Sequence, residues 1–187
     1  MTVTLTWQGP IGPGLFPADP MIFDSLCDAG VYLRIKTYAD DRIVAYAGQS
    51  VALLARFDQH LSAMLALAAP LRDDGGAVVY SGDAGERLAA YGNLPDMAAL
   101  AAADAGRVRF FYALCDAYFH TEHLNLAEGL LQRRITERLS DIENAVAAPG
   151  RLPDDVPDRW ENDFSGLDAG GREVLTTLLG TAPMTLA

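Results

Sequence analysis

The sequence has few cysteines and few basic residues, and both shortages narrow its possible functions. Cys27 and Cys115 stand far apart, without a CxxC pair or a Cys/His spacing typical of structural zinc. This pattern offers no disulfide framework and favours a reducing, cytoplasmic setting. Lysine and arginine number 14 against 25 acidic residues, for a net charge of -11. Such a charge opposes broad electrostatic binding of nucleic acid, because phosphate is bound by cations that displace counterions.

A basic N-terminal segment and long apolar runs are also missing. Residues 1–20 contain no lysine or arginine, and four prolines interrupt them, so we expect no signal peptide. No apolar stretch is long enough to span a bilayer, so we expect no membrane partner. Half of the 187 residues are apolar, which suffices for one substantial core and fits one domain with additional segments.

The hydrophobic periodicity predicts an α/β (α+β) fold, in which a small, mainly antiparallel, three-stranded sheet packs with helices. Residues at alternate positions of 30–36 are apolar, as in a half-buried strand. Ser50 is a reasonable N-cap for an amphipathic helix. The expected order is β-β-α-insertion-β-α. Its elements are strands over 30–36, 42–48 and 107–114 and helices over 50–65 and 124–140.

Composition divides the chain into three parts. We expect an irregular N-terminal arm over 1–27, because residues 9–20 are rich in Pro/Gly turn signals. The domain proper covers 28–145, with an insertion of unassigned role over 66–106. An acidic, loop-rich tail covers 146–187; from residue 141 onward nine acids stand against three arginines. Trp160 and Phe164 could dock this tail onto the core.

Several residues occur along the chain in an order that is typical of one family. Gly30-Val31-Tyr32 and Tyr46-Ala47-Gly48 lie on the first two predicted strands, Arg56 and His60 on the first helix, and Glu128 on the later helix. In this ordered pattern residues 28–145 resemble the GIY-YIG nucleases. The sequence departs from the family at Ala47, where isoleucine is usual, and in its long insertion.

The resemblance implies a divalent-metal-dependent endonuclease that hydrolyses phosphodiester bonds in nucleic acid. It favours DNA over RNA only because the family usually acts on DNA. It implies Mg²⁺ or Mn²⁺ held by Glu128, Arg56 on the scissile phosphate, and tyrosine or histidine helping to activate water. The matched catalytic positions are Tyr32, Tyr46, Arg56, His60 and Glu128. A metal and a planar guanidinium both stabilise charge on phosphoryl oxygens, which phosphodiester hydrolysis requires.

Further side chains could bind the substrate. Arg34 and Lys36 make the segment 30–60 slightly basic, and a local field can outweigh the net charge. Asn144 matches a late asparagine of the family that contacts phosphate. His60 is an easier base at neutral pH than Tyr32, because an unperturbed phenol has a pKa near 10.

Each candidate also has a structural interpretation. Tyr32 and Tyr46 could be ordinary cross-strand aromatics. Arg56 could lie on the helix surface, paired with Asp58 or another nearby acid, and His60 could be an ordinary half-buried histidine.

Glu128 could be the N3 partner of a capping box that begins at Asn125. It lies, however, on the apolar stripe of its helix, where a carboxylate is costly to bury without a cation or donors. This position favours a metal ligand.

An alternative function remains for the whole chain. A catalytically inactive GIY-YIG-like module that binds a protein partner or nucleic acid would suit the net charge of -11. The acidic tail could also dock on the domain itself, with Asp154, Asp155, Asp158 and Asp163 near the arginines as competitors of phosphate.

Overall fold

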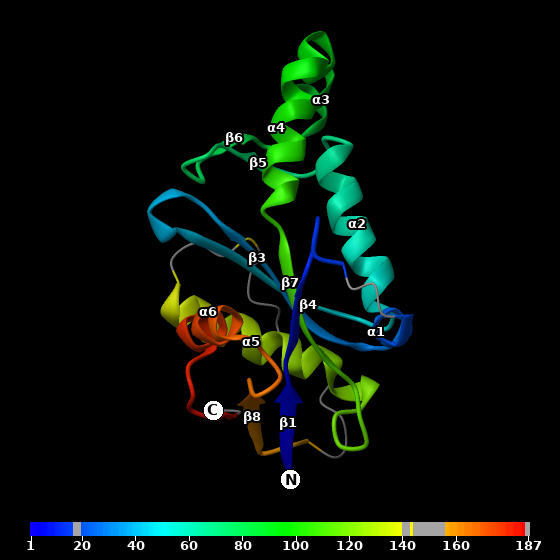
Figure 1. Cartoon of the computed structure of the whole chain (residues 1–187), viewed down its shortest axis with the longest axis vertical. Helices are drawn as coiled ribbons and strands as arrows, with labels where there is room; N and C mark the ends of the chain where they lie inside the picture. Colours follow the sequence, from blue (N-terminus) through cyan, green and yellow to red (C-terminus); the bar gives the residue numbers. More distant parts are fainter. Residues whose placement is uncertain (17–19, 140–142, 144–155, 186–187) are drawn as a thin grey trace.

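The computed structural model describes residues 1–16, 20–139, 143 and 156–185 (Figure 1). It has a mixed α/β architecture with antiparallel strands, as the periodicity predicts. Within the described residues, no helix combines the length and the apolar character needed to cross a membrane.

The central sheet has four strands, one more than expected. In spatial order they are β2 (Gln8–Ile11), β7 (Arg109–Leu114), β3 (Gly30–Thr37) and β4 (Ile43–Ser50), all paired antiparallel. Because β3 lies between β7 and β4 and both faces are covered, residues 30–36 are all buried. The strand that alternates in sequence is therefore buried on its polar face as well.

Helices cover the two faces of this sheet. α2 (Leu53–Leu65) packs on the face that carries Tyr32, which shares a core cluster with Phe57. α5 (Leu124–Arg138) packs on the opposite face, with the side chain of Leu33. Ser50, the expected N-cap of the first helix, lies just before the observed N-cap, Ala52. Ser50 Oγ accepts a hydrogen bond from the Ala52 amide at 3.0 Å, so it caps the turn before α2 rather than α2 itself.

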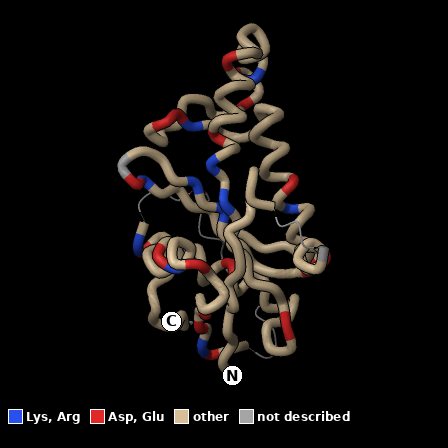
Figure 2. Tube along the Cα trace, viewed as in Figure 1, with Lys and Arg blue, Asp and Glu red and all other residues tan. Residues whose placement is uncertain are grey.

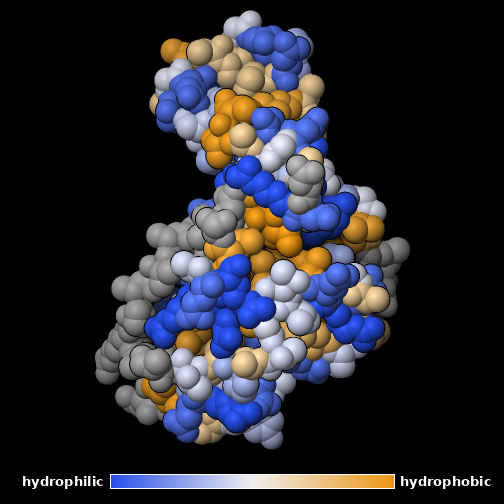
Figure 3. All heavy atoms as spheres, turned by 90° about the vertical axis from the view of Figure 1, so that its left-hand side faces the viewer, coloured by the Kyte–Doolittle hydropathy of each residue, from blue (hydrophilic) through white to orange (hydrophobic). Residues whose placement is uncertain are grey.

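The insertion folds into a hairpin and two helices. It contains β5 (Leu71–Arg72), β6 (Val78–Tyr80), α3 (Ala84–Ala90) and α4 (Leu94–Gly106). α4 packs against α2. Lysine and arginine residues gather where the central strands approach the insertion (Figure 2). In the space-filling view the outer part of the insertion stands above the body as a narrower lobe (Figure 3).

The N-terminal segment is not the irregular arm that its turn signals predict. β1 (Thr2–Thr6) buries Val3 and Leu5, and it pairs in parallel with β8 (Arg159–Asp163). A short helix, α1 (Pro20–Ser25), precedes β3. The expectation fails because β1 has only five residues and its partner lies at the other end of the chain, so the local pattern carries little signal.

The described part of the C-terminal segment is likewise not a loop-rich tail. β8, α6 (Ala169–Leu179) and β9 (Met184–Thr185) follow one another, and β8 joins β1 and β9 in a three-stranded sheet. α6 packs against α5. Trp160 is fully buried, so this segment belongs to the core.

Two of the four aspartates expected near the arginines, Asp158 and Asp163, do not have that role. Asp158 pairs with the N-terminal ammonium at 2.9 Å, and Asp163 accepts a hydrogen bond from the Ser165 amide. Neither contact involves an arginine. Asp154 and Asp155 lie outside the described residues.

We expect Trp160→Ala to lower the free energy of unfolding by about 3–5 kcal/mol, because it removes a large, fully buried side chain from β8. Urea denaturation followed by circular dichroism measures the change. Tyr118→Ala is the control, since that side chain is 66% exposed and its loss should cost about 0.5 kcal/mol or less. Equal losses for both variants would contradict the assignment of this segment to the core.

Candidate active site

Two tyrosines share one face of the β3–β4 hairpin. Tyr32 lies opposite Gly48, and Arg34 lies opposite Tyr46. Residues directly opposite each other in an antiparallel pair point to the same face, so this register brings both tyrosines to the α2 side. Their ring centroids are 6.1 Å apart with an interplanar angle of 18°. Tyr32 is fully buried, whereas Tyr46 is half-buried.

Gly48 leaves the space that this arrangement needs. A Cβ at this position would lie 2.5 Å from Tyr32 Oη and 2.8 Å from Tyr46 Cε1. Gly30, in the other tripeptide, has a different reason: its Cβ would lie 2.4 Å from the Ala113 carbonyl oxygen of β7. At both positions a side chain would clash with neighbouring atoms, but only at Gly48 are those atoms part of the two tyrosines.

Arg56 and His60 approach the tyrosines from α2, one turn apart. Arg56 Nε donates to Tyr32 Oη at 3.2 Å, and Arg56 Nη2 donates to Tyr46 Oη at 3.5 Å. His60 Nε2 lies 2.6 Å from Tyr32 Oη. The structure thus brings four of the five expected catalytic residues into one hydrogen-bonded group, which we call the tyrosine cluster: Tyr32, Tyr46, Arg56 and His60. Arg56 Nη1 donates to Gln59, so contacts with Gln59 and the two tyrosines, rather than the alternative pair with Asp58, hold this guanidinium.

The neighbours of His60 determine its tautomer. Arg34 Nη1 lies 2.9 Å from His60 Nδ1, and a guanidinium can only donate. Nδ1 must therefore accept, which leaves the ring proton on Nε2, where it is donated to Tyr32 Oη. The phenol oxygen thus receives two hydrogen bonds, one from His60 and one from Arg56. Its own proton is therefore donated to neither of them.

Burial keeps both central groups neutral. It lowers the pKa of His60 to about 3, with help from the positive charges of Arg34 and Arg56. It also raises the pKa of the Tyr32 phenol above its ordinary value, although the hydrogen bond from Arg56 acts in the opposite direction. At neutral pH His60 has no unoccupied lone pair. In this state it orients Tyr32 and is not itself placed as a base.

Glu128 lies on α5, beside the edge strand of the sheet. Its Oε1 accepts a hydrogen bond from Gln132 Nε2 at 3.3 Å, and the same amide contacts the Ala47 carbonyl of β4 at 3.3 Å. The carboxylate is half-buried. Burial raises its pKa, and the nearby charge of Arg56 opposes this. The positive charge of Arg56, in the tyrosine cluster, therefore acts on the Glu128 carboxylate.

The capping-box interpretation of Glu128 does not hold. α5 begins at Leu124 with His123 as its N-cap, so Asn125 is already inside the helix. Asn125 Oδ1 instead accepts a hydrogen bond from Gln49. Within the described part of the chain, no group of three or more His, Cys, Asp or Glu side chains could enclose a metal ion. A dication at Glu128 would need oxygens from water and phosphate, as Mg²⁺ commonly does.

The two expected substrate-binding cations have internal partners. Arg34 and Lys36 follow Tyr32 on the same face of β3, and they are only 8% and 1% exposed. Arg34 pairs with Glu143, and Lys36 Nζ lies 3.1 Å from Asp104 Oδ2 and 3.2 Å from Glu143 Oε1. They therefore do not project into solvent as free binding groups. Asn144, the third expected substrate contact, lies outside the described residues.

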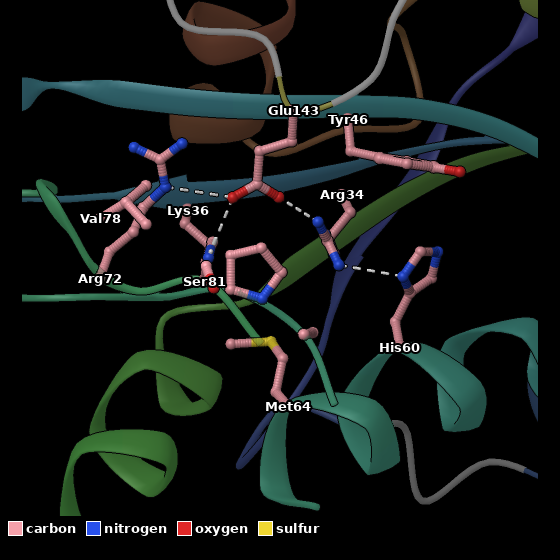
Figure 4. Close-up of a pocket in the computed structure, with 11 residues that line it drawn as sticks. Arg34, Lys36, Tyr46, His60, Met64, Arg72, Val78, Ser81 and Glu143 are labelled. Carbon is pink, nitrogen blue, oxygen red and sulfur yellow. Dashed lines mark hydrogen bonds and ion pairs between the residues drawn. The ribbon is translucent and has the colours of Figure 1, made fainter. Parts of the chain in front are cut away.

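A cleft of about 470 Å³ opens beside the tyrosine cluster (Figure 4). It extends from Tyr46 and His60 along β3 to the hairpin of the insertion, where Arg72 and Ser81 line it. Glu143 closes one side. Sequence reasoning missed Arg72, Asp104 and Glu143 because they come from three separate segments, and no periodicity links them to β3.

We expect acid to destabilise the protein through His60. The folded-state pKa of about 3 lies below the ordinary value of 6.5, so the unfolded chain binds this proton first. The contribution of neutral His60 to the free energy of unfolding is therefore complete above pH 6.5 and is lost as the pH falls towards 3. In His60→Gln this component disappears. The difference in unfolding free energy between wild type and His60→Gln should shrink with acid, by at most about 1.4 kcal/mol per pH unit.

Urea denaturation between pH 4 and 8, followed by the fluorescence of the two tryptophans, measures that difference. His120→Gln is the control, because the His120 side chain is 52% exposed. A constant difference between wild type and His60→Gln over this range would contradict the burial of a neutral imidazole.

Comparison of the chain with models of protein families, with curated proteins and with solved structures finds no match. The interpretation of the site accordingly depends on its residues and their geometry.

Proposed function

We propose that the chain is a GIY-YIG-type nuclease, a divalent-metal-dependent endonuclease that hydrolyses phosphodiester bonds, with DNA as the first substrate to test. The observation that carries this proposal is the tyrosine cluster. Two strands and one helix supply its four side chains, which are joined by hydrogen bonds on one face of the sheet.

The chain order of the central elements supports the proposal. The β3–β4 hairpin is followed by α2, the insertion, β7 and α5, and β3 pairs with both β4 and β7. This is the order that the sequence resemblance implies. The strand β2 and the sheet β1-β8-β9 are additions to it.

Arg56 would stabilise the charge that develops on the phosphoryl oxygens. A planar guanidinium presents five N–H donors, and in the free protein its three nitrogens contact Tyr32, Tyr46 and Gln59. These contacts hold the guanidinium in place before substrate binds. A donor that is already oriented contributes most in a site shielded from water.

Tyr32 would accept a proton from the attacking water only as a phenolate, which forms when its own proton passes to bulk solvent, because neutral His60 has no lone pair to take it. His60 Nε2 and Arg56 Nε both donate to its oxygen, and both bonds strengthen when that oxygen becomes a phenolate. Burial opposes this ionisation. The geometry therefore assigns His60 the role of orienting Tyr32 and of stabilising its anionic form.

Glu128 would hold the divalent cation. Its partly buried carboxylate has a raised pKa, which indicates that burial is only partly compensated, and a dication would supply the missing charge. When bound, Mg²⁺ or Mn²⁺ supplies Lewis-acid stabilisation of the phosphoryl oxygens and lowers the pKa of coordinated water.

A catalytically inactive module that binds nucleic acid or a protein is the alternative, and the net charge of -11 favours it. Cleavage of a fluorescently labelled DNA duplex and of an RNA of the same sequence, with Mg²⁺, Mn²⁺ or EDTA, separates the two functions.

We expect Glu128→Gln to lower metal-dependent cleavage by more than about 100-fold, because even outer partners of metal ligands typically contribute 10–100-fold. Glu137→Gln makes the same charge change at an exposed position of α5 and should cleave normally. Equal rates for the two variants, with equal circular dichroism spectra, would rule out Glu128 as the metal ligand.

We expect Arg56→Lys to lower the cleavage rate by about 10²–10³-fold, since an ammonium keeps the charge but loses the planar donor set. Arg172→Lys, at an exposed position of α6, is the matched control. A rate near that of wild type would mean that Arg56 only supports the two tyrosines.

A further inference from the structure

Three cations surround a single carboxylate next to the tyrosine cluster. We call Arg34, Lys36 and Arg72 the cationic group. One oxygen of Glu143 pairs with Arg34, and the other lies 3.2 Å from Lys36 Nζ and 3.2 Å from Arg72 Nε (Figure 4). These attractions outweigh burial and lower the pKa of Glu143, so its side chain remains an anion at neutral pH.

Glu143 reaches this position across the edge of the sheet. Its backbone N–H donates to the Ala45 carbonyl oxygen of β4 at 2.9 Å. Its side chain is 13% exposed, whereas the Lys36 side chain beneath it is 2% exposed. The carboxylate is thus slightly more exposed than the three cations it contacts.

A second carboxylate, Asp104, pairs with the cationic group. Asp104 is fully buried, receives a hydrogen bond from Tyr38 and pairs with Lys36 from the side of α4. Among the described residues, Asp104 and Glu143 are the carboxylates that pair with the three cations. In addition, Arg34 Nε is buried without a hydrogen-bond partner in the described part of the chain.

The cationic group adjoins the reacting groups directly. Arg34 Nη1 lies 2.9 Å from His60 Nδ1, and its guanidinium lies 5.0 Å from the centre of the Tyr46 ring. A strand whose phosphate contacts Arg56 could therefore continue along β3 into the cleft. The cleft volume of about 470 Å³ falls within the range of about 300–1,000 Å³ that is usual for ligand sites.

We propose that Arg34, Lys36 and Arg72 form a subsite for a second phosphodiester of the substrate strand, and that Glu143 occupies this subsite in the free protein as an internal competitor. This inference rests on the proposed nuclease function and concerns how the same cleft takes its substrate. The two oxygens of the carboxylate occupy the place of two non-bridging phosphate oxygens, which suit arginine donors equally well. Asp104 remains with Lys36 when the phosphate replaces Glu143.

Binding is tested with Glu143→Gln, which keeps the shape of the side chain and removes its charge. Fluorescence anisotropy measures the Kd of a short DNA duplex and of a single strand in EDTA, over a series of salt concentrations. We expect Glu143→Gln to bind about tenfold more tightly than wild type at low salt, with a salt slope steeper by about one, as for one added phosphate contact.

Glu137→Gln is again the matched control, because it makes the same charge change at an exposed site. A gain for Glu143→Gln no larger than the gain for Glu137→Gln would overturn the proposal. Adding Arg72→Gln to Glu143→Gln should abolish the gain, and a persistent gain would equally overturn it. Protection of Glu143→Gln by inorganic phosphate against thermal unfolding, without tighter oligonucleotide binding, would indicate a site for free phosphate and refute the strand subsite.

A second variant covers the case in which Glu143→Gln fails to fold. Glu143→Asp keeps the charge but shortens the reach to the cations, so it should give a smaller gain in affinity; no gain would overturn the proposal. Since all binding is measured without metal, the outcomes separate the two proposals. Tighter binding without cleavage in the Mg²⁺ assay would refute only the nuclease function, and cleavage without tighter binding would refute only the subsite.

Discussion

The candidate site depends on the register of the β3–β4 hairpin, in which Tyr32 lies opposite Gly48. Because side chains alternate between faces, a slip of one residue would move Tyr46 to the α5 side and separate the two phenols. Gly48 stabilises the observed pairing by leaving room for the Tyr32 hydroxyl, which any Cβ would approach within 2.5 Å. Arg56 and His60 then contact Tyr32 from α2.

The net charge of -11 does not describe the charge around the candidate site, where cations are concentrated. The chain is strongly acidic, yet three cations converge beside the tyrosine cluster, where they pair with Glu143 and Asp104. Burying cations is tolerated because each has an anionic partner within hydrogen-bond distance. The pairing of Lys36 with Asp104 also ties the insertion to the sheet, since α4 supplies the carboxylate and β3 the ammonium. The Lys36–Asp104 ion pair thus connects the insertion to a strand that lines the cleft.

Two of the candidate catalytic groups, Tyr32 and His60, are neutral in the free protein. His60 has a pKa of about 3, and its tautomer is set by Arg34, so its proton points to Tyr32. This arrangement prevents a positive imidazolium from forming between two arginines. It also makes His60, the residue that sequence reasoning favours as the base, a hydrogen-bond donor to Tyr32. Its ring nitrogens are both engaged, with Arg34 at Nδ1 and Tyr32 at Nε2.

The sequence by itself determined the central strands, the two long helices and the grouping of side chains on each. Alternation placed Tyr32, Arg34 and Lys36 on one face, and the spacing of Arg56 and His60 placed both on one side of α2, because these periodicities are local properties of the backbone. Only the tertiary structure decided that β1 pairs with β8 and that the C-terminal segment enters the core. It also decided that Glu143, Arg72 and Asp104 meet at β3. These contacts join residues distant in sequence, and their stability comes from burial and charge pairing in the folded chain, which leave no periodic mark on the sequence.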